Sequence, residues 1–175
     1  VGLYAVYCQT KFNFAVSEVG IFTILNVIAA GSASFIAGKL GDKFGHKTSM
    51  MLAYLSHFIA VLLAIFSQNM FWVYGIFIAI GVGQGAFMPS AMNLVYDFAN
   101  DRDTKTYMAL VDSFLAPFVL IFIMGIGALI RVGNYTISLY ILGTSIILGM
   151  LILQFIVRDP KHSLETSFHV DGFSS

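Results

Sequence analysis

The chain has 175 residues, of which 58% are apolar and only 10% are charged, and its formal net charge is zero. Soluble domains carry roughly 25% charged residues, so this composition excludes a water-soluble globule and places the chain in a lipid bilayer. A zero net charge gives no indication of a nucleic-acid partner. The single cysteine, Cys8, cannot form an intramolecular disulfide.

Charge-free runs predict the membrane-spanning helices, since about 20 apolar residues cross the hydrocarbon core. Residues 1–9 are too short to span, and we interpret them as the end of a truncated helix. One long charge-free run, 48–96, is divided at its polar cluster, residues 67–70 (SQNM). The five expected spans are 18–38, 48–66, 70–96, 106–130 and 135–157. We therefore expect an all-α integral membrane bundle over residues 1–158 and a disordered polar tail, 159–175.

The connections between these spans alternate between the two sides of the membrane, and their charge is unequal. One side holds only Lys11 and Arg131. The other side holds seven basic residues: Lys39, Lys43, Lys47, Arg102, Lys105, Arg158 and Lys161. Cytoplasmic loops carry an excess of basic residues. The connection at 38–48 and the tail are therefore expected to be cytoplasmic, and the protein to be a multi-pass protein of the plasma membrane, or of the inner membrane if bacterial.

The connection at residues 38–48 (GKLGDKFGHKT) concentrates glycine and charge in an otherwise apolar sequence. We expect it to be a tight hairpin in which Gly38 and Gly41 let two helix ends approach closely. Gly45 suits a turn position with positive φ. Asp42 is an acceptor for the exposed N–H groups of a helix N-terminus. Three basic residues are expected to hold the hairpin at the cytoplasmic face: Lys43, His46 and Lys47.

The order of residues in this hairpin resembles the signature loop of the major facilitator superfamily, G-x-L-[AG]-D-[RK]-x-G-[RKH]-[RK], at every defined position. The family has twelve helices in two halves of six, and the motif follows the second helix and often the eighth. No long basic loop follows the last span here. The resemblance therefore favours the C-terminal half, helices seven to twelve, with an N-terminal half that ends after helix six as the alternative.

The resemblance implies a secondary active transporter that works by alternating access, with no cofactor. Its partners are then the lipid bilayer, a small-molecule substrate, and a second half that comes from the same chain or from a second copy. Asp42 is implied to lock the cytoplasmic side by meeting a helix N-terminus of that second half. The residues of this gating motif are Gly38, Leu40, Asp42, Lys43, Gly45, His46 and Lys47.

Polar residues inside the spans are the candidates for substrate or proton binding. Gln84 lies near mid-membrane, where its amide needs either the substrate or another helix as partner. Asn26 is a weaker candidate, and Asn93 is expected to form a helix–helix hydrogen bond. Asp112 lies inside a span and either takes up a proton or pairs with Lys105 near the head groups.

Glycine and proline mark possible helix hinges. Pro89 removes the hydrogen bond to the carbonyl of Gly85, which favours a kink. Gly81 and Gly85 either add to this hinge or permit close helix packing. Pro117 marks a second possible kink. In the resemblance the span 70–96 is helix ten, which lines the transport cavity and gates it.

His57 lies in a span that is peripheral in the family, so a structural hydrogen bond is favoured over a proton relay. Tyr4 and Tyr7 either gate the outer mouth or belong to an interfacial aromatic belt, and the belt is favoured. The sequence has no metal-ligand spacing and no nucleophile–base pair, so we expect no metal and no enzyme activity. Few charges face the cavity, and the motifs of sugar porters are missing, which favours a neutral or lipophilic substrate and a drug- or metabolite-type porter. The alternatives are a non-transporting membrane sensor or assembly subunit on this scaffold, and a half-size transporter that acts as a dimer.

Overall fold

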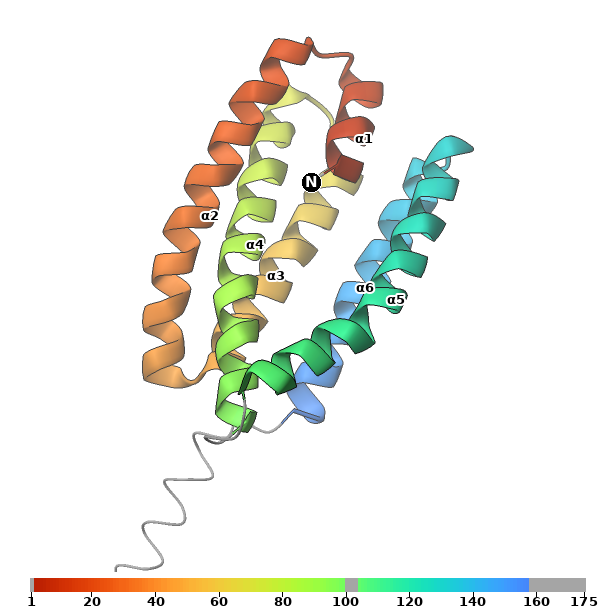
Figure 1. Cartoon of the computed structure of the whole chain (residues 1–175). Helices are drawn as coiled ribbons and strands as arrows, with labels where there is room; N and C mark the ends of the chain where they lie inside the picture. Colours follow the sequence, from red (N-terminus) through yellow and green to blue (C-terminus); the bar gives the residue numbers. More distant parts are fainter. Residues whose placement is uncertain (1, 100–103, 158–175) are drawn as a thin grey trace, which may run out of the picture.

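The computed structural model describes residues 2–99 and 104–157 (Figure 1). The described residues form α-helices and no strand. The six helices are α1 (Gly2–Phe12), α2 (Val16–Phe44), α3 (His46–Phe66), α4 (Met70–Ala99), α5 (Thr104–Arg131) and α6 (Tyr135–Phe155).

Five of these helices are long and apolar enough to cross a membrane. They contain the candidate spans Ser17–Phe44, His46–Phe66, Met70–Tyr96, Lys105–Arg131 and Tyr135–Phe155. The short α1, at 11 residues, is the exception. The prediction of an all-α bundle with five spans and one short helix is therefore confirmed.

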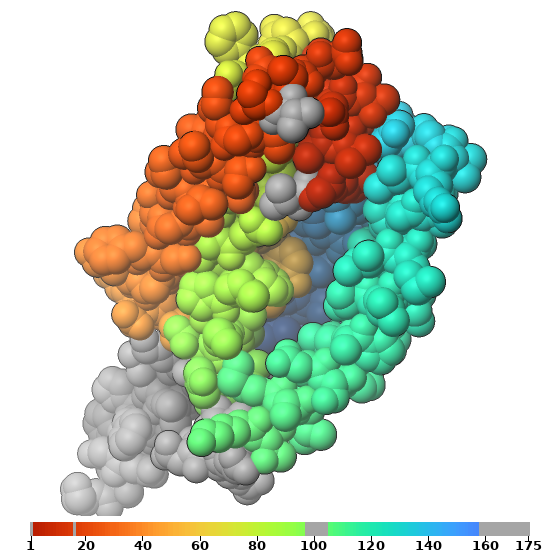
Figure 2. Space-filling view, turned by 45° about the horizontal axis from the view of Figure 1, so that its top comes forward, coloured from red at the N-terminus to blue at the C-terminus, as the bar shows by residue number. Residues whose placement is uncertain are grey.

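Helix α4 is the centre of the bundle and packs along both α2 and α3 (Figure 1). Helix α6 packs on α3. Helix α5 contains Pro117, makes only short contacts with α4 and α6, and bends partway along its length. The space-filling view shows α5 as an arm that stands apart from α4 (Figure 2). The best-packed part of the molecule is thus α2–α3–α4, and α5 is its least supported helix.

Aromatic packing holds the bundle together at the end away from the α2–α3 hairpin. The ring of Phe22 lies 5.2 Å from that of Phe14, 5.1 Å from that of Tyr74 and 5.2 Å from that of Phe77, measured between centroids. Each such pair contributes about 0.5–1.5 kcal/mol beyond its buried area. These contacts fix the start of α2 against α4.

Small residues bring α2 and α4 together along the rest of their length. A Cβ atom at Gly81 would lie 2.9 Å from the Cβ of Ala29, and one at Gly85 would overlap the backbone of Ala30. Closer to the hairpin, three buried alanines meet from three helices: Ala37, Ala53 and Ala86. Without side chains in the way, helix backbones approach closely and gain dispersion contacts. Gly81 and Gly85 are therefore packing residues here, and their role as hinges stays a prediction.

The structure corrects the predicted hairpin. The prediction ended one helix at Gly38 and began the next at Thr48, but α2 continues to Phe44 and α3 begins at His46. Gly45 alone separates them, with φ of 89°. Its N–H still bonds to the carbonyl of Gly41. Charged residues had suggested a loop, yet they suit the exposed last turns of a helix that extends beyond the apolar core.

The other boundaries differ by a few residues from those predicted. Helix α4 runs to Ala99, α5 begins at Thr104 and α6 ends at Phe155. The turn between α3 and α4 lies within the polar cluster that divided the long charge-free run. The predicted disordered tail, 159–175, lies outside the described residues.

Candidate functional site

Two glycines of the hairpin motif are each required by the local geometry. Gly45 has the positive φ that L-residues adopt only under strain, as predicted. Gly41 is buried, and a Cβ there would overlap the imidazole ring of His46. At Gly38 a Cβ would meet nothing within 4 Å. The expected close approach therefore occurs at Gly41 and is absent at Gly38.

Lys47, the last basic residue of the motif, ties the hairpin to the end of α6. Its Nζ donates to the carbonyl oxygens of Gln154, at 3.0 Å, and Val157, at 2.7 Å. The last carbonyls of a helix have no partner within the helix, and a cation there is favoured by the helix dipole. The motif thus caps the end of a helix that lies more than 100 residues further along the chain.

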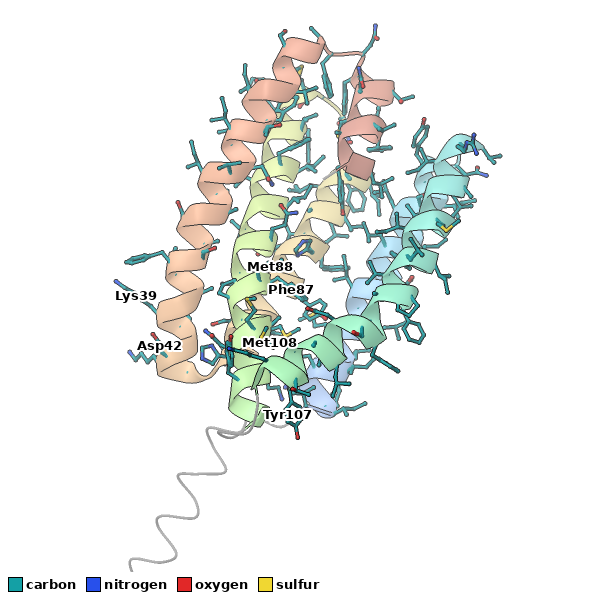
Figure 3. The ribbon with its side chains drawn as sticks, viewed as in Figure 1. Lys39, Asp42, Phe87, Met88, Tyr107 and Met108 are labelled. Atoms are coloured by element: carbon teal, nitrogen blue, oxygen red, sulfur yellow. The ribbon has the colours of Figure 1, made fainter. Side chains whose placement is uncertain are left out.

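Asp42 lies on the outer side of the bundle. Lys39 and Asp42 project from α2 away from the other helices (Figure 3). Both side chains are exposed, and the ammonium of Lys39 lies 4.3 Å from the centroid of the Phe35 ring. The exposed Lys43 lies in the same way over its neighbour Phe44, at 5.0 Å, and Leu40 is half-buried. The acidic residue of the motif therefore faces outward from the described helices.

Two side chains of α2 hydrogen bond to the backbone of α4. The buried Asn26, only 8% exposed, donates from Nδ2 to the carbonyl of Phe77 at 3.1 Å. Ser34 donates from Oγ to the carbonyl of Gly85 at 2.8 Å. Asn26 therefore joins two helices in this structure, and its role in substrate binding stays a prediction.

A pocket of about 530 Å³ lies between α1, α3, α4, α5 and α6. Figure 2 shows the hollow between α4 and α5, with α6 at its floor. Its wall is mainly apolar and includes Ile80, Phe122, Ile126, Ile130, Leu142 and Ile146. Three polar side chains also line it: Tyr4, His57 and Gln84. An apolar cavity with a few polar groups is the usual form of a small-molecule site.

These three polar side chains have unused hydrogen-bonding capacity. Tyr4 is 4% exposed, and its hydroxyl has no hydrogen-bond partner among the described residues. Gln84 is exposed, and its carboxamide has no hydrogen-bond partner within the described part of the chain. The Nδ1 of His57 lies 2.9 Å from the carbonyl oxygen of Ala53. Because a carbonyl only accepts, Nδ1 carries the proton of that bond, which leaves Nε2 of the neutral ring as an acceptor.

The structure brings only one of the predicted binding residues into this pocket. Gln84 lines it, whereas Asn26, Asn93 and Asp112 are not among its described lining residues. Asn93 is half-buried on α4, and Asp112 is exposed on α5. These three residues remain candidates, but no common site joins them to Gln84.

Sequence reasoning missed Tyr4 and undervalued His57. The aromatic-belt interpretation is wrong for Tyr4, because its side chain is buried in the bundle. His57 makes the favoured structural hydrogen bond and also lines the pocket. Gly83 on α4 packs against the ring of His57 on α3, a contact that the sequence did not indicate. A Cβ at Gly83 would lie 2.9 Å from Cγ of the His57 ring.

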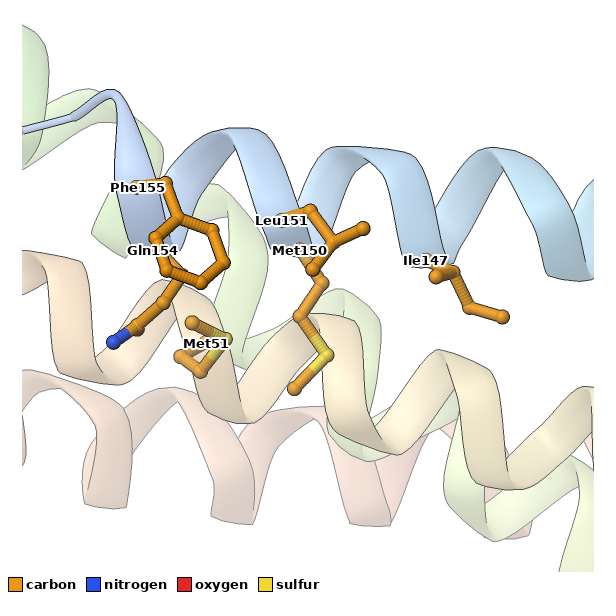
Figure 4. A pocket seen from close by; sticks show the side chains of 6 residues that line it. All are labelled: Met51, Ile147, Met150, Leu151, Gln154 and Phe155. Carbon is orange, nitrogen blue, oxygen red and sulfur yellow. The ribbon is translucent and has the colours of Figure 1, made fainter.

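A second pocket, of about 420 Å³, lies between α3 and α6 near the hairpin (Figure 4). It is lined by Met51, Ile147, Met150, Leu151, Gln154 and Phe155. This lining is apolar apart from one amide, so the pocket offers no chemistry beyond packing. Within residues 2–99 and 104–157, no group of three or more His, Cys, Asp or Glu side chains could hold a metal ion.

The number of long apolar helices and their lengths indicate a multi-pass membrane protein. The chain matches the Major Facilitator Superfamily over residues 1–172 and belongs to that family. A stretch of 98 residues, 56% of the chain, is 26% identical to the niacin transporter NiaP of Acinetobacter baylyi. That match spans 22% of the length of the niacin transporter. No solved structure gives a significant match.

Proposed function

We propose that the chain is the C-terminal six-helix half of a secondary active transporter that moves a small organic solute by alternating access. The second half comes from the same native chain or from a second copy. The hairpin and the tail lie on the cytoplasmic side of the plasma membrane, or of the inner membrane in a bacterium. The excess of basic residues on that side supports this orientation.

The observation that carries the proposal is the outer surface of α2 that ends at Asp42. Large apolar side chains along α2 are exposed: Ile21, Ile24, Val27, Ile28, Phe35 and Ile36. In α5 the most apolar part of the span has no buried residue. Two long helices with so little protein cover suit a second helical unit that packs against both, with Asp42 at the edge of the contact. A carboxylate there would be favoured by the N-terminus of a facing helix.

An uptake assay with the native protein in liposomes tests this role. Asp42→Asn should fold normally and lower uptake by about fivefold or more, the size of a typical coupling between two sites. Lys39→Gln, one turn earlier on the same surface, should retain uptake. The solutes assayed should include niacin, because of the relative named above, together with neutral metabolites and drugs. Normal uptake by a well-expressed Asp42→Asn variant would remove the gating role.

The energy source is proposed to be a proton gradient, with Asp112 as the group that takes up the proton. A carboxylate inside a span is costly and is usually functional. Asp112→Asn should make uptake insensitive to a protonophore, whereas uptake by the wild type should fall when the gradient is collapsed. Wild-type uptake that ignores the gradient contradicts this coupling.

Two other functions use the same scaffold, and the intact mass of the native protein together with its transport activity separates them from the first. A mass near twice the 19.2 kDa of this chain supports two halves in one chain. A mass near 19.2 kDa supports a half-size transporter that dimerises. Failure to transport any solute, with the helices intact, would favour a membrane sensor or assembly subunit.

A further inference from the structure

We propose that the pocket between α4 and α5 binds the cargo, and that this cargo is an uncharged, mainly apolar organic molecule that both donates and accepts hydrogen bonds. The inference rests on the proposed transport function only where it names the bound molecule as cargo. The binding site itself follows from the geometry of Tyr4, His57 and Gln84.

The first argument is the buried hydroxyl of Tyr4. Burying a hydroxyl without a partner costs roughly 1–3 kcal/mol by mutational data. Tyr4 is 4% exposed, lines the pocket, and has no hydrogen-bond partner among the described residues. Filling this side of the pocket with apolar side chains alone would need no tyrosine. A polar group on a bound molecule gives the hydroxyl its partner.

The second argument is that the polar side chains of the pocket offer both hydrogen-bond donors and hydrogen-bond acceptors to a ligand. His57 offers an acceptor at Nε2, because Nδ1 is committed to the carbonyl of Ala53. The amide of Gln84 donates and accepts, and so does the hydroxyl of Tyr4. Gly83 lets α4 pack directly against the imidazole ring, so the orientation of His57 is fixed. A ligand therefore needs at least one donor, for His57, and gains from an acceptor.

The third argument is charge. No Asp, Glu, Lys or Arg is among the lining residues that the structure describes. An ion in such an apolar pocket would lose hydration without a counter-charge, which costs several kcal/mol. The volume of about 530 Å³ is within the usual range of small-molecule sites. The pocket thus selects neutral molecules of modest size.

The fourth argument is access. Helix α5 touches α4 and α6 only over short stretches and bends partway along its length. The hollow is open between α4 and α5 in the space-filling view (Figure 2). A movement of α5 alone would widen or close this entrance without disturbing the α2–α3–α4 packing.

The test compares two probes of the same shape, benzamide and benzoate, on the full native protein in lipid nanodiscs. Binding is measured by saturation-transfer NMR, which needs no transport. Benzamide should bind, and benzoate should bind roughly tenfold more weakly or not at all. Tyr4→Phe and Gln84→Leu should each weaken benzamide binding about fivefold, the effect of one hydrogen bond. Tyr140→Phe, an exposed tyrosine on α6, is the control.

Two glycines on α5 allow a matched pair of substitutions, one that fills the pocket and one that leaves it open. Gly127 lines the pocket and Gly125 does not, and a Cβ at either position would meet nothing within 4 Å. Gly127→Leu should abolish benzamide binding, whereas Gly125→Leu should retain it. This pair also serves if a substitution of Tyr4 prevents folding.

Several results would overturn the site. They are tighter binding of benzoate than of benzamide, equal benzamide binding by Gly127→Leu, or no benzamide binding at millimolar concentration. A phospholipid that co-purifies with the wild type and is released by Gly127→Leu, without benzamide binding, would assign the pocket to an acyl chain instead. Benzamide binding in a protein that transports nothing would keep the site and remove the transport function.

Discussion

The hydroxyl of Ser34 on α2 donates a hydrogen bond of 2.8 Å to the carbonyl oxygen of Gly85 on α4. Gly85 lies four residues before Pro89, which has no N–H to offer that carbonyl. The group that proline leaves without its usual partner in α4 is therefore satisfied by α2. Gly85 is also where α4 packs directly on the backbone of Ala30, so the closest approach and the hydrogen bond occur at one residue.

Removing the Ser34 hydroxyl should destabilise the α2–α4 pair. Ser34→Ala is expected to lower the free energy of unfolding by about 0.6–1 kcal/mol, the usual value of such a bond in a membrane protein. With Pro89→Ala in the background, a backbone N–H becomes available to Gly85, and the same substitution should cost close to nothing. Thermal or denaturant unfolding of the four variants in detergent gives this coupling energy.

Ser32→Ala is the control for this cycle. Ser32 lies on the same helix, but its hydroxyl bonds to Ile28 within α2 and its side chain is exposed. Its removal should change the free energy of unfolding very little. An equal loss for Ser34→Ala with and without proline would show that the hydroxyl does not compensate for Pro89.

Adding one methyl group at Gly85 should separate α2 from α4. Gly85→Ala is expected to destabilise the protein by about 1–3 kcal/mol, because the new Cβ overlaps the backbone of Ala30, which cannot turn aside like a side chain. Gly31→Ala, where a Cβ meets nothing within 4 Å, should be neutral or stabilise by up to about 1 kcal/mol. Unfolding midpoints in detergent compare the two, and equal midpoints would contradict the packing.

Neutralising Lys47 should loosen the end of α6. Lys47→Met removes both hydrogen bonds to the carbonyls of Gln154 and Val157. Amide hydrogen exchange in the last turn of α6 should therefore become about fivefold faster, which corresponds to a loss of about 1 kcal/mol in the free energy of local opening. Lys43→Met, at an exposed lysine of the same motif, should leave this exchange unchanged. Equal exchange in both variants would mean that Lys47 does not cap the helix.

Tyr7 attaches the short α1 to the rest of the bundle. Its hydroxyl donates to the carbonyl of Ala64 at 3.1 Å and accepts from Nζ of Lys11 at 3.0 Å, and Lys11 also reaches Ser67. Tyr7→Phe should therefore cost about 1 kcal/mol and expose α1 to proteolysis. Tyr140→Phe, at an exposed site, should cost nothing. Unchanged proteolysis of Tyr7→Phe would show that ring packing alone holds α1.

The fold was largely predictable because charge and apolar length decide which segments enter a bilayer. The five spans and the position of the hairpin followed from that physics, and the positive φ at Gly45 followed from glycine chemistry. The extent of α2 did not follow. Hydropathy marks where the apolar core of the membrane ends, whereas the helix ends where its backbone bonds end, six residues later at Phe44.

The candidate site was less predictable, because it depends on which helices face one another. Gln84 could be found as a polar residue at mid-span. Tyr4 is a tyrosine near the start of an apolar segment, a pattern typical of the membrane interface, and only the packing of α1 shows that it is buried. The presence of Pro89 already indicated that the carbonyl of Gly85 lacks its usual partner within the helix. The donor that replaces this partner, Ser34, lies 51 residues away in the sequence and could not be predicted.

The single residue between α2 and α3 has a mechanical consequence. With Gly45 as the only non-helical position, the joint has no slack that could absorb a rotation of α2. Lys47, two residues beyond the joint, extends the linkage to the last turn of α6. A displacement of α2 at Asp42 would therefore be transmitted through Gly45 and Lys47 to the end of α6. The ends of α2, α3 and α6 near the hairpin would then move together.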